Sequence, residues 1–219
     1  MNDSIPFLIA TPAWIQLGAP LSLLSRRNLS RPVLWVAAGT TVSILGNLLG
    51  RFAAAKVGNN HWLSTIDDPL MFACFLAALE EWQVGYLEQL TFKFANFIIL
   101  AIYVLLVAFV EDVSTFSRFG MPMYSLALMT GGIWTLIRRA FQTATSALWA
   151  TDWFWVVGGL TLYGATTLLS QPIGAALLAH QRIDIFMLVW DFRAVCVDLS
   201  FLVIIAGMLL PPARLVPYR

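Results

Sequence analysis

Long apolar runs separated by short polar segments extend along the whole chain. Each run is about as long as the 20 or so mostly apolar residues with which a helix crosses the hydrocarbon core of a bilayer. The pattern predicts an all-α bundle of seven transmembrane helices, in a single domain that covers residues 1–219. The predicted spans are 5–24, 32–54, 66–86, 90–110, 119–137, 153–171 and 184–210.

The third predicted span, 66–86, has the weakest apolar pattern of the seven. Glu80 and Glu81 shorten its apolar part. If this segment does not cross the bilayer, the chain has six spans and the orientation derived below no longer follows.

Composition supports lipid as the solvent of this chain. Of its 219 residues, 59% are hydrophobic and 11% are charged, whereas a soluble domain carries about 25% charged and about 45–50% apolar residues. These values exclude a soluble domain, a disordered chain and a fibrous one. The net charge of +1 provides no basic excess for nucleic acid. Membrane lipids are therefore the expected partners, with other membrane protein subunits as a further class.

Lysine and arginine residues are distributed unevenly between the two sides of the predicted bundle. Cytoplasmic segments of membrane proteins carry more of these residues than external ones, so the distribution favours an external N-terminus and an internal C-terminus. Eight basic residues then lie inside: Arg26, Arg27, Arg31, Lys93, Arg138, Arg139, Arg214 and Arg219. Four lie outside: Arg51, Lys56, Arg118 and Arg182.

Charged residues inside the last span are the most informative feature of the sequence. Only residues 199–210 are free of charge, too few to cross the bilayer alone, so the span must carry charged side chains into or near the membrane at a cost of at least about 2.5–3.5 kcal/mol each. Asp184, Asp191 and Asp198 recur every seven positions and share one helical stripe, while Arg193 lies on the other face.

Three interpretations of these four residues remain open. The acidic stripe could form a proton or cation path from the outer mouth to the middle of the membrane. The charges could instead hydrogen-bond to neighbouring helices and hold the bundle together, or they could line a ligand pocket.

Small residues in the second span predict a close helix contact. Gly46 and Gly50 form a GxxxG motif, and Gly39 and Ser43 lie close to the same face. Such motifs let two helix backbones approach. An internal contact is favoured over an oligomer interface.

Other acidic residues suggest weaker candidates. Glu80-Glu81 and Glu111-Asp112 are pairs of adjacent carboxylates, and we interpret both as solvated helix ends. Asp67-Asp68-Pro69 is interpreted as an outer turn and the start of a helix, where aspartate favours the positive end of the dipole.

The cysteines and histidines indicate neither a metal nor a cofactor. Cys74 and Cys196 lie inside apolar runs without a CxxC motif. His61 and His180 fall near predicted outer connections, which does not suit a haem held by two histidines at membrane depth. The usual catalytic motifs are also missing, so a non-enzymatic protein is favoured and the cofactor stays unassigned.

Short motifs resemble those of small bacterial seven-helix membrane proteins of about 220 residues. They are Asn59–Leu63 before the third span, and Phe154-Trp155 with Leu162–Gly164 in the sixth. Members often show an aromatic residue and an acid inside the third span; Asp67 and Met71 stand at these positions here, so this chain departs from the pattern. The resemblance implies a sensor-like protein of the bacterial inner membrane and transfers no functional residue.

Three functions are consistent with the sequence. The preferred one is a non-catalytic sensor-like module or accessory subunit of a larger membrane assembly. The second is a small proton- or cation-coupled transporter that uses the acids of the last span. The third is an intramembrane enzyme acting on a lipid, with Glu80, Glu81 or the same acids as acid/base groups.

Overall fold

The computed structural model describes residues 14–25, 30–57, 61–111, 117–142 and 148–210. These residues are helical and contain no strand, so the prediction of an all-helical protein is confirmed for this part of the chain. The α-helices are α2 (Gly18–Ser22), α3 (Arg31–Val57), α4 (His61–Glu81), α5 (Tyr86–Phe109), α6 (Gly120–Gln142), α7 (Asp152–Ala179) and α8 (Ile183–Leu209), with short 3₁₀ turns η1 (Leu23–Ser25) and η2 (Leu148–Ala150).

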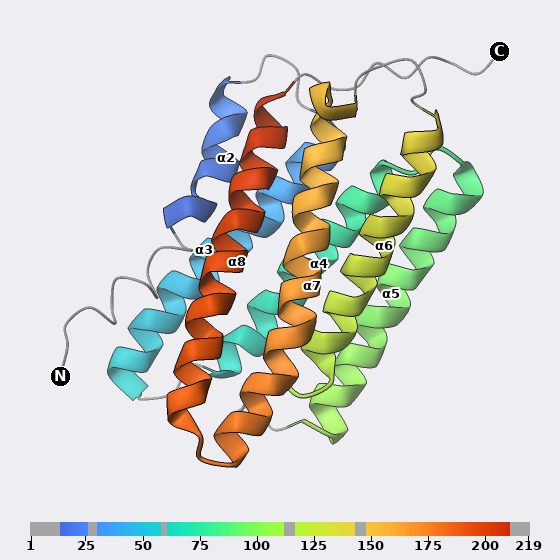
Figure 1. The fold of residues 1–219 in the computed structure, drawn as a ribbon. Helices are drawn as coiled ribbons and strands as arrows, with labels where there is room; N and C mark the ends of the chain where they lie inside the picture. The colour runs from blue at the N-terminus through green and yellow to red at the C-terminus, as the bar shows by residue number, and fades with distance from the viewer. Residues whose placement is uncertain (1–13, 26–29, 58–60, 112–116, 143–147, 211–219) are drawn as a thin grey trace.

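The long helices pack as an up-and-down bundle (Figure 1). Helix α7 lies between α6 and α8, and α4 lies behind this layer against α3, α5 and α6. Short α2 packs against α3 and α8. We call the end where α3, α5 and α7 begin the upper end, and the end where α4, α6 and α8 begin the lower end, as they appear in Figure 1.

Helix positions follow the predicted spans with three informative differences. Helix α4 begins and ends five residues before the predicted span 66–86, and α6 and α7 extend beyond the predicted spans 119–137 and 153–171. The start of the predicted span 5–24 lies outside the described residues, and its later part contains α2 and η1.

The early start of α4 corrects the interpretation of Asp67-Asp68-Pro69 as a turn and helix start. All three residues lie inside α4. Proline in a helix leaves the carbonyl four residues earlier without its usual donor, and here that is the carbonyl of Thr65. The hydroxyl of Tyr103 on α5 donates a hydrogen bond to this oxygen at 3.0 Å. A neighbouring helix thus satisfies the group that proline frees, which is how bundles tolerate proline in membrane helices.

Four helices are long and apolar enough to cross a membrane, judged by length and composition over the described residues. They are α3 within Arg31–Ala53, α4 within Trp62–Glu81, α5 over Tyr86–Phe109 and α8 over Ile183–Leu209. Helices α6 and α7 have sufficient length but are more polar. Thr167, Ser170 and Gln171 of α7 are buried, so this polarity is covered by protein.

The core lies between the α6–α7–α8 layer and α4. Phe72 of α4 contacts the rings of Tyr124 and Tyr163, each at a centroid distance of 5.7 Å. Tyr163 of α7 also meets Phe201 of α8 at 5.5 Å. Such aromatic pairs add about 0.5–1.5 kcal/mol beyond the burial of their area. This cluster joins four helices at the centre of the bundle.

Glycines allow the closest backbone contacts in the bundle. A Cβ atom at Gly159 of α7 would lie 2.7 Å from the carbonyl oxygen of Ser200 on α8, and one at Gly164 would lie 2.9 Å from the backbone nitrogen of Met129 on α6. No other residue fits at these distances. Helix α7 is therefore in backbone contact with both of its neighbours.

The small residues of the second predicted span face the interior of the bundle. A Cβ at Gly39 would meet Phe75 at 2.8 Å, and one at Gly46 would overlap the carboxylate of Asp67, so both glycines lie against α4. Ser43 donates a hydrogen bond to Oε1 of Gln16 at 3.1 Å, and Gly50 is buried.

Candidate functional site

Two places in the bundle combine polar chemistry with an unusual environment. The first is a charged cluster in the interior, which we define as Asp67 and Asp68 of α4 and Arg193 of α8. Arg193 lies close enough to Asp68 for the opposite charges to attract, and Asp67 lies beside Asp68 with the same sign. The cluster therefore brings two acids and one base together from helices that are distant in the sequence.

Arg193 is positioned by its own helix and by α4. Its guanidinium carbon lies 4.6 Å from the ring centroid of Trp190, one turn earlier on α8, a distance at which a cation is attracted to the ring face. Its Nε atom is buried and has no hydrogen-bond acceptor among the described residues. The half-buried guanidinium thus lies against an aromatic face and within electrostatic reach of Asp68.

The hydroxyl of Tyr163 connects the charged cluster to the aromatic core. Tyr163 lies within the electrostatic reach of Arg193 and Asp68, and its hydroxyl contacts the sulfur of Met71 at 3.8 Å. A half-buried acid, a half-buried base and a buried phenol therefore lie around one point between α4, α7 and α8. Such ionisable groups at membrane depth are expensive and commonly mark a function.

The acidic stripe of the last span lies differently from Arg193. Asp184 and Asp191 are exposed, and Asp184 pairs with Arg182 at 3.5 Å. Asp198 is half-buried. Arg193 instead continues the interior face of α8 that Val197, Ser200 and Phe201 form. The structure thus brings Arg193 to the acids of α4, while Asp184 and Asp191 lie on the exposed side of α8.

The second place is a groove between α4, α5 and α6 of about 500 Å³. It is open to the surface, because Leu87, Ala95 and Trp134 on its walls are exposed. Small side chains at Ala95 and Ala127 leave the space that larger ones would fill. The lining residues are Leu76, Leu87, Glu88, Thr91, Phe92, Ala95, Asn96, Ile99, Ala127, Thr130, Gly131 and Trp134.

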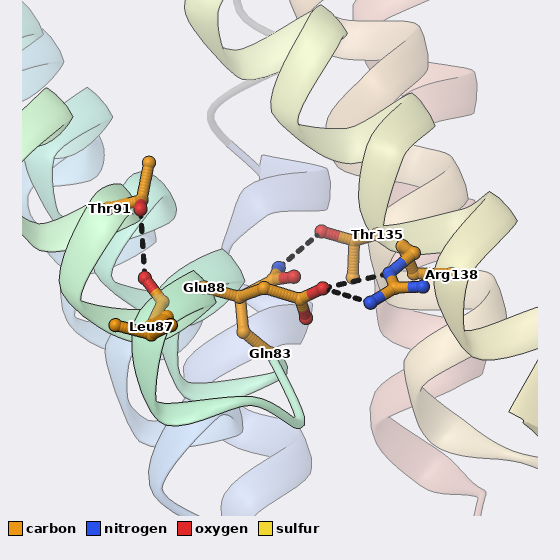
Figure 2. Close-up of polar contacts among 6 residues, drawn as sticks. All are labelled: Gln83, Leu87, Glu88, Thr91, Thr135 and Arg138. Atoms are coloured by element: carbon orange, nitrogen blue, oxygen red, sulfur yellow. Dashed lines mark hydrogen bonds and ion pairs between the residues drawn. The ribbon is translucent and has the colours of Figure 1, made fainter.

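The upper part of the groove is polar and bridges α5 to α6 (Figure 2). Glu88 of α5 accepts hydrogen bonds from Nε of Arg138, at 2.8 Å, and from Nη2 of the same guanidinium. The guanidinium carbon also lies 5.8 Å from the ring centroid of Trp134. This ion pair therefore marks one end of an otherwise apolar surface.

Hydrogen bonds around the α4–α5 turn fix this end of the groove. Nε2 of Gln83 donates to the hydroxyl of Thr135 at 2.7 Å (Figure 2), and Nε of Arg139 donates to the carbonyl of Trp82 at 2.6 Å. Lower down, Asn96 donates to the carbonyl of Ala73 at 3.1 Å. The first two bonds join the end of α4 and the α4–α5 turn to α6, and the bond of Asn96 attaches α5 to α4.

The remaining candidates of the sequence have structural surroundings of their own. Glu111 accepts hydrogen bonds from the backbone N–H groups of Phe119 and Gly120, at 2.6 and 3.1 Å, and so satisfies the first turn of α6. Asp112 lies outside the described residues. Cys74 and Cys196 are free thiols. In the described ranges no three His, Cys, Asp or Glu side chains are grouped to hold a metal ion.

Sequence reasoning missed the Asp68–Arg193 pair and the groove for different reasons. The pair follows from α4 starting at His61, which moves Asp68 from a turn into the bundle. An acid and an arginine in two different apolar segments were a signal that could have suggested it. The groove leaves no such signal, because alanine and glycine are common in apolar helices.

Comparisons with known proteins identify no relative of this chain. No protein-family model, curated protein or solved structure matches it at a significant level. A functional proposal therefore rests on the structure alone: on the exposed surface of α5, the charged cluster and the groove.

Proposed function

We propose that the chain is a multi-pass membrane protein of the bacterial inner membrane that acts without catalysis, as a sensor-like module or an accessory subunit of a larger membrane assembly. The orientation proposed with it is an external N-terminus and an internal C-terminus. In this orientation the upper end, which carries Arg31, Arg138 and Arg139, faces the cytoplasm.

The observation that carries this proposal is the exposed surface of α5. Tyr103 is the one buried residue of this 24-residue helix, while Phe97 and Phe109 are 69% and 82% exposed. Soluble monomers rarely expose apolar patches of this extent. A helix of this kind needs lipid or a neighbouring subunit around it. The connections between the long helices are short, so they leave few residues for a separate soluble function.

Labelling of single cysteines tests the membrane location and the orientation. Cysteine introduced at Lys56, at the lower end, should react with a membrane-impermeant maleimide in intact cells. Cysteine at Arg138, at the upper end, should react only after the membrane is opened. Cys74 and Cys196 are replaced by alanine in both variants. Equal labelling of both positions in intact cells would contradict the proposal.

Site-specific photocrosslinking tests the accessory role. A photoreactive amino acid at Phe97 should yield one cross-linked species of defined mass in native membranes. The same amino acid at Leu202 of α8, which is also exposed, serves as the control. If both positions give lipid adducts and no cross-linked protein of defined mass, the accessory role is contradicted, but the proposed membrane location is not.

The charged cluster supports a second candidate function, a small proton- or cation-coupled carrier. Acids and a base in the interior are what a carrier requires, and Asp198 lies five residues beyond Arg193 on α8. Purified protein in liposomes should then move protons down an imposed gradient, and Asp198→Asn should abolish this flux without unfolding the bundle. Absence of flux from the wild-type protein would remove this candidate and leave the first one standing.

The structure offers less support for a lipid-modifying enzyme with Glu80, Glu81 or the acids of the last span. Of the carboxylates, Glu88 is the one that lines the groove. A purified preparation incubated with membrane lipids should leave their composition unchanged, as measured by mass spectrometry.

A further inference from the structure

The dimensions of the groove correspond to one leaflet of a bilayer. Its lining residues on α5 extend from Leu87 to Ile99, which at 1.5 Å per residue is about 18 Å. One leaflet contributes half of a hydrocarbon core of about 30 Å, or about 15 Å. The volume of about 500 Å³ lies within the roughly 300–1,000 Å³ of typical ligand pockets. An acyl chain that lies along α5 has the length and the polarity of this space.

The polar end of the groove lies where a lipid headgroup would be. Glu88 is in the first turn of α5 and Arg138 is near the end of α6, so their pair marks the upper end of the bundle. Trp134 is 49% exposed and lies below Arg138, and tryptophan prefers the layer between headgroups and acyl chains. The groove therefore runs from headgroup depth toward the middle of the membrane.

The charges at this end select among headgroups. The side chain of Arg138 is 50% exposed and that of Glu88 is 20% exposed, and Arg138 directs one amino group away from Glu88 (Figure 2). An anionic headgroup would compete with Glu88 for the guanidinium. A zwitterionic headgroup can place its phosphate on Arg138 and its ammonium on Glu88, so that neither charge loses its partner.

We propose that the α4–α5–α6 groove binds one phosphatidylethanolamine molecule from the leaflet at the upper end, with an acyl chain along Ala95, Ala127 and Gly131 and the headgroup at Glu88 and Arg138. This inference rests on the membrane location proposed above. The proposal assigns the groove to phosphatidylethanolamine. It rejects two other occupants, an anionic lipid and an apolar helix of another subunit.

A photoreactive lipid tests the position of the acyl chain. The full-length protein is placed in nanodiscs that contain phosphatidylethanolamine with a diazirine near the end of one acyl chain, and the adducts are mapped by mass spectrometry. Adducts should concentrate on residues 95–99 and 127–131, at the end of the groove away from Glu88 and Arg138. Adducts spread evenly over the exposed faces of α3, α5 and α8 would overturn the proposal, although they would still agree with a membrane protein.

Matched alanine variants separate the groove from the rest of α5. Ala95→Phe fills the groove, whereas Ala101→Phe adds the same ring to an exposed position of the same helix that does not line it. The first variant should lower the groove adducts about tenfold, the equivalent of 1.4 kcal/mol in binding, and the second should leave them unchanged. Equal labelling of the two variants would contradict the acyl-chain assignment.

The headgroup is tested with two lipids and two arginine variants. Phosphatidylethanolamine should label the groove several-fold more than phosphatidylglycerol with the same acyl chains. Arg138→Gln should remove this preference, and Arg182→Gln, which changes an ion-paired arginine at the lower end, should retain it. Equal labelling by both lipids in the wild-type protein would refute the headgroup assignment. Melting temperatures of all variants show that the bundle remains folded.

Discussion

Helix α7 and helix α5 differ in how much of their surface the protein itself covers. Twelve of the 28 residues of α7 are buried, and its glycines bring it into backbone contact with α6 and α8. In α5 one residue of 24, Tyr103, is buried. Helix α7 can contain threonine, serine and glutamine because neighbouring helices surround them, whereas α5 must be apolar on nearly every side.

The comparison explains why hydropathy detects α5 and not α7. Mean hydropathy measures how well a helix is suited to lipid, and the sequence of α5 meets this requirement without the help of neighbouring helices. A helix inside a bundle is suited instead to its neighbours, through small residues and interhelical hydrogen bonds. The apolar character of α5 agrees with its peripheral position, but α3 is also apolar enough to span a membrane although much of it is buried, so polarity alone does not locate a helix in the bundle. Variants whose stability is measured by reversible SDS unfolding in mixed micelles test this contrast.

The largest effect is expected at the charged cluster in the interior of the bundle. Arg193→Met should lower the free energy of unfolding by about 2–3 kcal/mol, because it removes the positive charge that attracts the half-buried Asp68. The double variant Asp68→Leu with Arg193→Met should recover most of this loss, since it removes both charges. A double variant no more stable than Arg193→Met alone would show that the two residues do not form a functional pair.

The next effect tests the backbone contact between α7 and α8. Gly159→Ala should cost about 1–3 kcal/mol, because the new methyl group overlaps Ile204 and the backbone of Ser200. A methyl group at the adjacent Gly158 would meet nothing within 4 Å, so Gly158→Ala should gain up to about 1 kcal/mol from helix propensity. Equal effects at the two positions would contradict the close approach of the helices.

A smaller effect is expected at the one buried contact of α5. Tyr103→Phe should cost about 0.6–1 kcal/mol, because the carbonyl of Thr65 loses its donor. The same substitution should cost less when Pro69 is replaced by alanine, whose backbone N–H restores the bond within α4. An unchanged cost in the alanine background would mean that the hydroxyl does not compensate for the proline.

The smallest effect is expected on the outer face of α5. Phe97→Ala should change stability by less than about 0.5 kcal/mol, since an exposed side chain has little packing to lose. Phe201→Ala in α8 should cost about 3–5 kcal/mol, because Phe201 is fully buried in the aromatic core. A large loss at Phe97 would show that α5 packs against protein, as it would in a stable oligomer.

The amino-acid pattern determined the all-helical class of the described residues and the approximate position of the long helices. Apolar runs of membrane-spanning length must form helices, since no other element satisfies the backbone of a single segment in lipid. Helix α8 accordingly differs from the predicted span 184–210 by one residue at each end. Helix ends were harder to predict, because proline in α4 and polar residues in α7 are compensated by other helices.

The partners of the charged residues were decided by the tertiary structure alone. Helical periodicity correctly placed Arg193 opposite Asp191 on α8, but it could not show that this face meets Asp68 of α4, because that contact depends on how two distant helices are rotated and packed. The groove has the same origin. Ala95 and Ala127 leave a hollow only because α4, α5 and α6 pack around them, and periodicity within one helix contains no information about its neighbour.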